Sequence, residues 1–229
     1  MRGINFLSIL LSKTCRISFF AIAAGMFLLN ACVSQQTGFD DTAFRQSRPR
    51  SILVMPPINM SNDMGAPATF LATSVMPLAE SGYYVIPVAL SELTFRLNGV
   101  TVAEEAHAIS PLRLREIFGA DAALYITITH YGVTYILVNS VVKASASARL
   151  VDLRTGQELW KGDVSVDLSN NYNSNSLLAL IVVAAVDQVV NTVTDKAYDA
   201  GKQANAKLLS AGNYNGLLYG PYHELYESD

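Results

Sequence analysis

The sequence predicts an α/β domain of α+β character, in which a mixed sheet combines a parallel βα part with an antiparallel three-strand meander. Two observations predict this class. In the first part of the chain, short apolar runs alternate with segments whose apolar residues recur at helical spacing. After Asp121 the apolar period changes to two. Helices are expected to pack on the sheet, with a long helix at the C-terminal end.

The parallel part begins at Ile52–Met55, a continuous apolar run closed by two prolines, which is typical of a strand buried on both faces. Ser110 followed by Pro111 marks the start of a helix. Pro77 leaves open whether an earlier helix kinks or ends early. The elements predicted here are strands at 52–55 and 83–87, a loop at 58–63, and helices at about 66–80, 88–97 and 111–118.

Three later segments alternate apolar and polar residues, so each presents one apolar and one polar face. Three such strands in succession predict an antiparallel meander, with a turn at Asp152–Gln157. A final helix is expected over about 177–209, followed by an irregular tail rich in Tyr and Gly. The apolar positions of the three strands are Leu124, Ile126 and Ile128, then Val142, Ala144, Ala146, Ala148 and Leu150, then Trp160, Val164, Val166 and Leu168.

The first 31 residues have the layout of a signal peptide. Arg2, Lys13 and Arg16 form a positive region. Residues 17–29 then form an uncharged apolar stretch that is too short to span a bilayer as a helix. We therefore expect residues 1–31 to be removed from the mature protein.

The four residues Leu29-Asn30-Ala31-Cys32 end this stretch, and they resemble the lipobox of bacterial lipoproteins. The resemblance implies cleavage before Cys32 and acylation of that residue, and several acyl chains anchor a protein stably. Val33 stands where an aspartate tends to retain lipoproteins at the inner membrane. The expected location is therefore the outer membrane, facing the periplasm. The alternative is an ordinary secretory signal with a chance cysteine.

Cleavage would leave residues 32–50 as a lipidated flexible tether, because this segment is polar and aperiodic, and 51–229 as a single periplasmic domain. The formal charge falls from −3 to −6, since the three charges lost are all basic. Such a chain offers no basic surface for nucleic acid. Cys32 becomes the only cysteine, which excludes an intrachain disulfide, thiol catalysis and a cysteine-based zinc site.

The sequence contains no constellation of catalytic residues. The histidines at 107, 130 and 223 are far apart, and no nucleophile elbow, P-loop or dinucleotide-binding glycine pattern is present. Glu104 and Glu105 are adjacent, which is typical of a solvated face. We therefore expect a protein that is not an enzyme, with no catalytic residue, no metal and no cofactor. The alternative, an envelope hydrolase, would depend on Glu104, Glu105 or His107.

Two segments are candidates for an interface. The run 177–186 is apolar on every side, which predicts a buried helix that packs over the sheet, forms a subunit interface or contacts a membrane. The tail carries several tyrosines, which are favoured at interfaces, and the alternative is that it docks onto its own domain. The candidate interface residues are Leu177, Leu180, Ile181, Val183, Ala184, Tyr214, Tyr219 and Tyr222.

Ile52–Ser61 resembles the first strand and loop of domains related to the TolB amino-terminal domain, and Ala148–Trp160 resembles their late hairpin. That group includes curli-secretion-channel-like lipoproteins. The mature chain, including Gly119–Ala122 and the Gly216–Pro221 ending, more closely resembles a family of bacterial lipoproteins of unknown function within this group. The resemblance implies a periplasmic α/β domain that works through protein contacts, and it brings no catalytic residues.

These observations predict an outer-membrane lipoprotein that acts as a non-catalytic assembly or accessory subunit of a cell-envelope complex, in secretion or envelope biogenesis. Expected partners are the membrane through the lipid anchor, further copies of the chain as a dimer or larger homo-oligomer, and other envelope lipoproteins. The alternative is a pore-forming subunit of a curli-type secretion channel, because residues 122–131 and 141–150 each have the length of a transmembrane strand.

The lipobox interpretation predicts that Cys32→Ser abolishes both palmitate labelling and retention in the membrane fraction, because the acyl chains need the Cys32 thiol. Metabolic labelling and membrane fractionation of the unmodified chain and the variant check this. Unchanged labelling of the variant would exclude Cys32 as the anchor.

Overall fold

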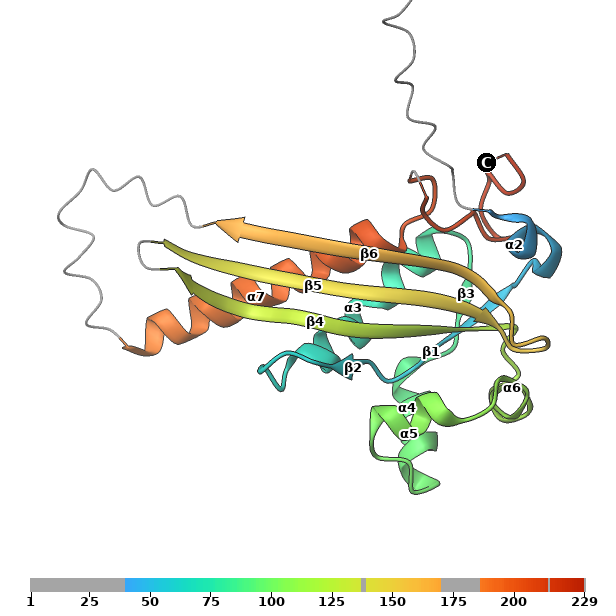
Figure 1. The fold of residues 1–229 in the computed structure, drawn as a ribbon, viewed down its shortest axis with the longest axis horizontal. Helices are drawn as coiled ribbons and strands as arrows, with labels where there is room; N and C mark the ends of the chain where they lie inside the picture. Colours follow the sequence, from blue (N-terminus) through green and yellow to red (C-terminus); the bar gives the residue numbers. More distant parts are fainter. Residues whose placement is uncertain (1–39, 137–138, 170–185, 214, 229) are drawn as a thin grey trace, which may run out of the picture. The chain divides into compact units, whose positions relative to one another are not determined.

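The computed structural model describes residues 40–136, 139–169, 186–213 and 215–228. These residues form an open mixed sheet with helices packed on it, so the predicted fold class is confirmed (Figure 1). The strands are β1 (Ser51–Val54), β2 (Ile58–Asn59), β3 (Tyr84–Val85), β4 (Ala122–Ile136), β5 (Asn139–Asp152) and β6 (Glu158–Ser169). The helices are α2 (Thr42–Ser47), α3 (Ala66–Glu80), α4 (Val88–Leu97), α5 (Ala103–Ala108), α6 (Pro111–Phe118) and α7 (Val186–Leu209).

The sheet has the strand order β3-β1-β4-β5-β6, and β2 also pairs with β4. Strand β1 lies parallel to both β3 and β4, with Ile52 opposite Val85 on one side and Ala122 on the other. Strands β4, β5 and β6 pair antiparallel in sequence order. The predicted combination of a parallel βα part and an antiparallel meander is therefore confirmed.

Strand β1 is buried on both faces and separates two hydrophobic clusters. Ile52 and Val54 belong to the larger cluster, which includes side chains of α3 and α7. Leu53 and Met55 belong to the smaller one, which includes side chains of α4, α5 and α6. Because successive side chains of a strand point to opposite faces, the two helix groups cover opposite sides of the sheet.

The meander lies in front of α3 and α7 in the view of Figure 1, and α7 packs along β4, β5 and β6. The side facing α7 is apolar, whereas the other side of β5 and β6 carries hydroxyl and charged side chains. Strand β4 differs in its first half, where Ala123 and Tyr125 are also buried. They belong to the cluster beneath α4, α5 and α6, so the predicted alternation is interrupted there.

The tether predicted to extend to Arg50 is wrong in its final part. Thr42–Ser47 form α2, which contacts β6, and the Phe44 side chain is only 3% exposed within the larger cluster. A six-residue helix with one core residue has no periodicity that a sequence can reveal. Within the described residues, the folded domain thus begins before Ser51.

Several finer details also differ from the sequence-based expectations or were left open by them. The loop predicted at 58–63 contains β2, and α5 lies where no element was predicted, because both elements are too short to show a period. Pro77 does not end α3, which continues to Glu80 with Pro77 buried inside it. The strand predicted at 83–87 is shorter, over Tyr84–Val85. The final helix is described only from Val186 onward.

The burial of Phe44 predicts that Phe44→Ala lowers the free energy of unfolding by about 3 kcal/mol, since it removes a buried aromatic ring and leaves a cavity. Denaturant unfolding measures this change. Gln46→Ala, at an exposed position of the same helix, is the matched control. Equal stability of the two variants would contradict the placement of α2 in the core.

Candidate functional site

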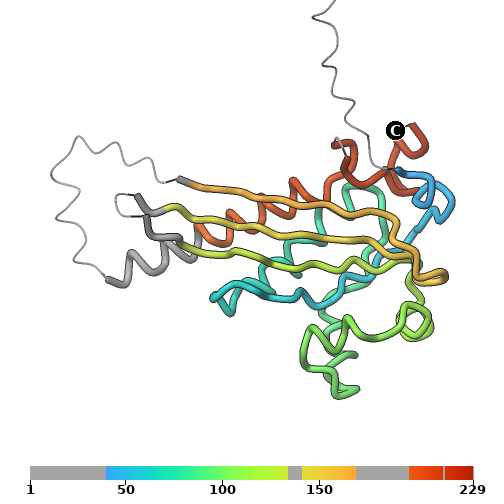
Figure 2. Tube along the Cα trace, viewed as in Figure 1, coloured from blue at the N-terminus to red at the C-terminus, as the bar shows by residue number. Residues whose placement is uncertain are grey.

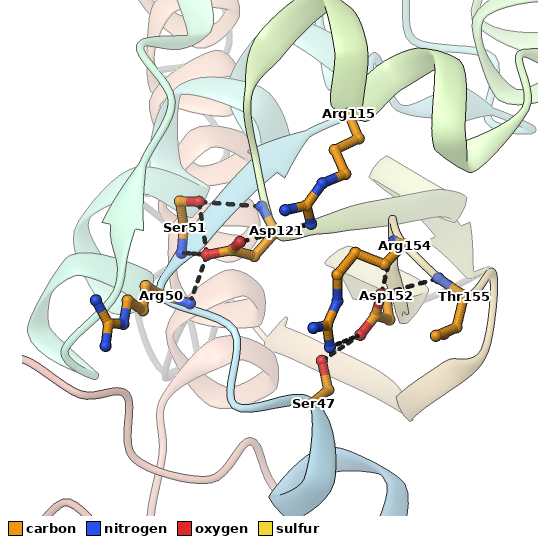
Figure 3. Close-up of polar contacts among 8 residues, drawn as sticks. All are labelled: Ser47, Arg50, Ser51, Arg115, Asp121, Asp152, Arg154 and Thr155. Atoms are coloured by element: carbon orange, nitrogen blue, oxygen red, sulfur yellow. Dashed lines mark hydrogen bonds and ion pairs between the residues drawn. The ribbon is translucent and has the colours of Figure 1, made fainter.

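The carboxylate of Asp121 fixes the chain where it enters β1 (Figure 3). Its Oδ2 accepts hydrogen bonds from the backbone N–H groups of Arg50 and Ser51, at 3.0 and 3.3 Å, and from the Ser51 hydroxyl at 3.1 Å. The Asp121 N–H in turn lies 3.0 Å from Ser51 Oγ. The Arg115 guanidinium lies 3.7 Å from the other carboxylate oxygen. This cluster joins the start of β1 to the residue just before β4.

Asp152, at the end of β5, holds Ser47, the last residue of α2 (Figure 3). Its carboxylate is 2% exposed and accepts hydrogen bonds from the Ser47 hydroxyl at 2.5 Å, and from Arg154 N and Thr155 N at 2.7 and 3.1 Å. Burial opposes ionisation, but the bonds from Ser47, Arg154 and Thr155 outweigh it and lower the pKa of Asp152. The predicted turn after Asp152 is therefore also an attachment point for α2.

The tyrosine-rich tail is bound to its own domain. The tail backbone donates to the α3–β3 loop, from Gly220 N to Ser81 O at 2.8 Å and from Tyr222 N to Gly82 O at 3.1 Å. At Gly82, where φ is +88°, a Cβ would lie 2.6 Å from atoms of His223, so the approach requires glycine. The tail thus docks onto its own domain, which the sequence analysis gave as the alternative to an interface with a partner.

The predicted tail tyrosines have different surroundings. Tyr219 stacks on His223 with ring centroids 4.2 Å apart, whereas Tyr222 is 70% exposed. Tyr214 lies outside the described residues. The end of the tail runs beside α2, where Glu227 forms an exposed ion pair with Arg48 at 3.0 Å (Figure 2). Of these tyrosines, Tyr222 therefore remains a candidate for contact with a partner.

The other predicted sites fall outside the described residues. They comprise the lipobox and lipidation site Leu29, Asn30, Ala31 and Cys32, and the apolar positions Leu177, Leu180, Ile181, Val183 and Ala184. Within the ranges that the structure describes, no helix has the length and apolar character needed to cross a membrane.

Helix α4 exposes a leucine stripe that the sequence analysis did not single out. Leu90, Leu93 and Leu97 are 61%, 46% and 78% exposed, and they follow one another at helical spacing. The side of α4 that faces the sheet instead carries Ser91 and Phe95. We call Leu90, Leu93 and Leu97 the α4 leucine face. Further exposed apolar side chains follow α4 in the chain, at Val102, Leu112 and Ile117.

His107 differs in its surroundings from Glu104 and Glu105, which lie on the same helix. Both glutamates are exposed on α5, whereas His107 is half-buried with its Nε2 2.9 Å from Pro56 O and its ring edge-on to Tyr125. Burial lowers the pKa of His107, and the hydrogen bond to Pro56 opposes this shift only in part. Among the described residues, no group of three His, Cys, Asp or Glu side chains could hold a metal.

The lowered pKa of Asp152 makes it a source of stability that depends on pH. A depressed folded pKa stabilises the protein above the unfolded value of about 3.8, and this stability is lost as pH falls through the folded value. Asp152→Asn should lower the free energy of unfolding by about 1–3 kcal/mol at pH 7 and flatten its fall below about pH 4. Denaturant unfolding from pH 2 to 7 measures both effects. The control Asp199→Asn, at an exposed position of α7, should change the free energy of unfolding by no more than about 0.5 kcal/mol. If the free energy of unfolding of Asp152→Asn followed the same pH dependence as that of this control, the account would be contradicted.

Comparison with known proteins identifies the family of this chain. The model of the family described as "Putative lipoprotein GNA1162-like" matches residues 39–222. The protein named "Putative lipoprotein NMB1124/NMB1162" from Neisseria meningitidis serogroup B is 46% identical over 199 residues, covering 86% of this chain and 93% of that one. The crystal structure of lipoprotein GNA1162 from Neisseria meningitidis matches with 48% identity and a TM-score of 0.52, covering 62% of this chain and 99% of that chain. The chain belongs to the GNA1162-like lipoprotein family.

Proposed function

We propose that this lipoprotein is anchored to the outer membrane through Cys32, faces the periplasm, and acts as a non-catalytic assembly or accessory subunit of a cell-envelope complex. The observation that carries the proposal is the α4 leucine face. It is an apolar surface on the outside of a helix, which a partner protein can cover without any change in the fold.

The energetics of the α4 leucine face support protein docking. Covering an exposed leucine fully contributes roughly 1.5–3 kcal/mol, so three leucines on one stripe offer several kcal/mol to a partner. Contiguous exposed apolar residues with a polar rim mark interaction sites in soluble domains. The nearby Glu92 and Arg96 pair with each other at 3.3 Å, so a partner need not supply a matching charge. A predominantly apolar partner surface fits this face best.

The position of α2 limits how far the domain can stand from the membrane. Thr42 lies ten residue steps after Cys32, and ten steps of any conformation span at most about 36 Å. A lipid on Cys32 would therefore keep the domain close to the bilayer. Other lipoproteins or further copies of this chain, held near the same membrane, are the partners most available to the α4 leucine face.

The two rival functions have less support. A pore-forming subunit would need apolar strand faces for lipid, but the apolar side of β4, β5 and β6 packs against α7 in the described residues. That rival predicts ring-shaped oligomers in detergent and membrane conductance. An envelope hydrolase would need His107 to act with Glu104 or Glu105, but both glutamates are exposed and the His107 Nε2 is engaged by Pro56 O.

In-cell crosslinking tests the proposed subunit role. A photo-crosslinking residue at Leu90 should yield one discrete adduct, whose mass distinguishes a second copy of the chain from another envelope protein. Leu97→Glu should reduce that adduct at least about tenfold, because burying an unpaired carboxylate at an apolar interface is costly. The variant should keep its melting temperature, since Leu97 is 78% exposed.

The matched control places the same photo-crosslinking residue at Gln203, which is exposed on α7. It should yield no adduct that depends on Leu97. If Leu90 and Gln203 gave the same products, or if Leu97→Glu left the Leu90 adduct unchanged, the docking role of the α4 leucine face would be contradicted.

A further inference from the structure

A second surface lies on the polar side of the meander, opposite α7. A pocket of about 210 Å³ opens there between α5 and the three strands. Its polar lining comes from His107 on α5 and from residues of β4, β5 and β6: Tyr125, Thr127, Ser147, Arg149, Glu158, Lys161 and Asp163. This pocket shares no residue with the α4 leucine face, so it stands independently of the proposed function.

Strand register places two cations directly opposite each other in this pocket. Tyr125 pairs with Arg149 across β4 and β5, and Arg149 pairs with Lys161 across β5 and β6. Like charges directly opposite on adjacent strands are destabilising. Among the described residues, neither Arg149 nor Lys161 has a carboxylate within ion-pair distance.

Further along the strands, on the same side of the sheet, a cation lies opposite a carboxylate instead. Lys143 on β5 lies directly opposite Asp167 on β6, and the two form an ion pair at 3.9 Å. The Arg149–Lys161 row therefore differs in charge from the Lys143–Asp167 row. Glu158 and Asp163 also line the pocket, but neither forms an ion pair with Arg149 or Lys161. A negatively charged ligand would supply the direct ion pair that these two cations lack.

The Arg149 guanidinium is held in place by stacking. Its central carbon lies 4.3 Å from the centroid of the Tyr125 ring, and Tyr125 is buried. His107 packs edge-on against the same ring at 5.0 Å and is itself held by Pro56 O. A stacked guanidinium keeps its N–H edge available for a bidentate acceptor at little further cost in entropy.

We propose that this pocket binds the oxyanion group, phosphate or carboxylate, of a small hydroxylated molecule. Arg149 and Lys161 bind the oxyanion, and the hydroxyls of Thr127 and Ser147 add donors beside it. Glu158 and Asp163, which also line the pocket, accept hydrogen bonds from hydroxyl groups of the ligand. The mixture of two cations and two carboxylates favours a hydroxylated anion over a bare one.

His107 provides a built-in reporter of occupancy. After burial and the Pro56 hydrogen bond, the charge of Arg149 contributes to its pKa by lowering it, while Glu104 raises it. An anion bound to Arg149 offsets the positive charge, so it should raise the pKa of His107. Arg149→Gln should raise the pKa of His107 in the free protein and remove its response to the anion.

The test uses the intact lipoprotein in detergent micelles, with its three histidines isotopically labelled and followed by NMR. Inorganic phosphate, glucose 6-phosphate, glucuronate and glucose are titrated separately. We expect saturable shifts at His107 with the three anions, tighter binding of the hydroxylated anions than of phosphate, and no shift with glucose. Comparison of glucose 6-phosphate with glucuronate identifies which oxyanion the pocket prefers.

Variants separate specific binding from general charge effects. Arg149→Gln should weaken binding at least about tenfold, as expected for loss of a charge-assisted bidentate contact, and Lys161→Gln should weaken it less. The control Lys143→Gln removes the same charge from the same side of the sheet and should leave binding unchanged. Equal weakening by Lys143→Gln, or the absence of a saturable His107 shift with every anion, would overturn the proposal.

Discussion

The attachment of residues 47–51 to Asp121 and Asp152 is the constraint on which the remaining structure depends. The segment leads directly into β1, which lies parallel to both β3 and β4. A slip of one residue in β1 would exchange its two faces and place each side chain in the wrong hydrophobic cluster. Because the carboxylates precede β4 and end β5, they fix β1 relative to the strands on which both helix layers pack.

The two helix layers that pack on this sheet leave two separate surfaces for interaction. One side of the sheet is closed by α3 and α7, and α4, α5 and α6 cover only part of the other side. The α4 leucine face therefore points away from the core, while the polar pocket beside α5 remains open on the uncovered part of the meander. Membership of the GNA1162-like lipoprotein family agrees with a domain that is anchored to a membrane.

Much of the fold could be predicted because its strong signals are local. The helices at 66–80 and 88–97 have the predicted bounds, and the change of period after Asp121 correctly predicts the meander. The sites were less accessible to sequence reasoning. Helix α4 carries apolar residues on two sides, and only its tertiary contacts decide that Phe95 rather than Leu93 faces the core. The Arg149–Lys161 row depends on the register between β5 and β6, which was not predicted from the sequence.

Native-state hydrogen exchange tests the central claim most directly, by comparing the amide of Arg50 with that of Met55. Arg50 N–H donates to Asp121 at 3.0 Å, and Met55 N–H donates to Leu124 O at 2.9 Å in the sheet. If the Asp121 attachment is part of the cooperative fold, both amides should exchange with opening free energies within about 1 kcal/mol of each other. Fast exchange at Arg50 beside strong protection at Met55 would show that the attachment opens independently, and would contradict the account.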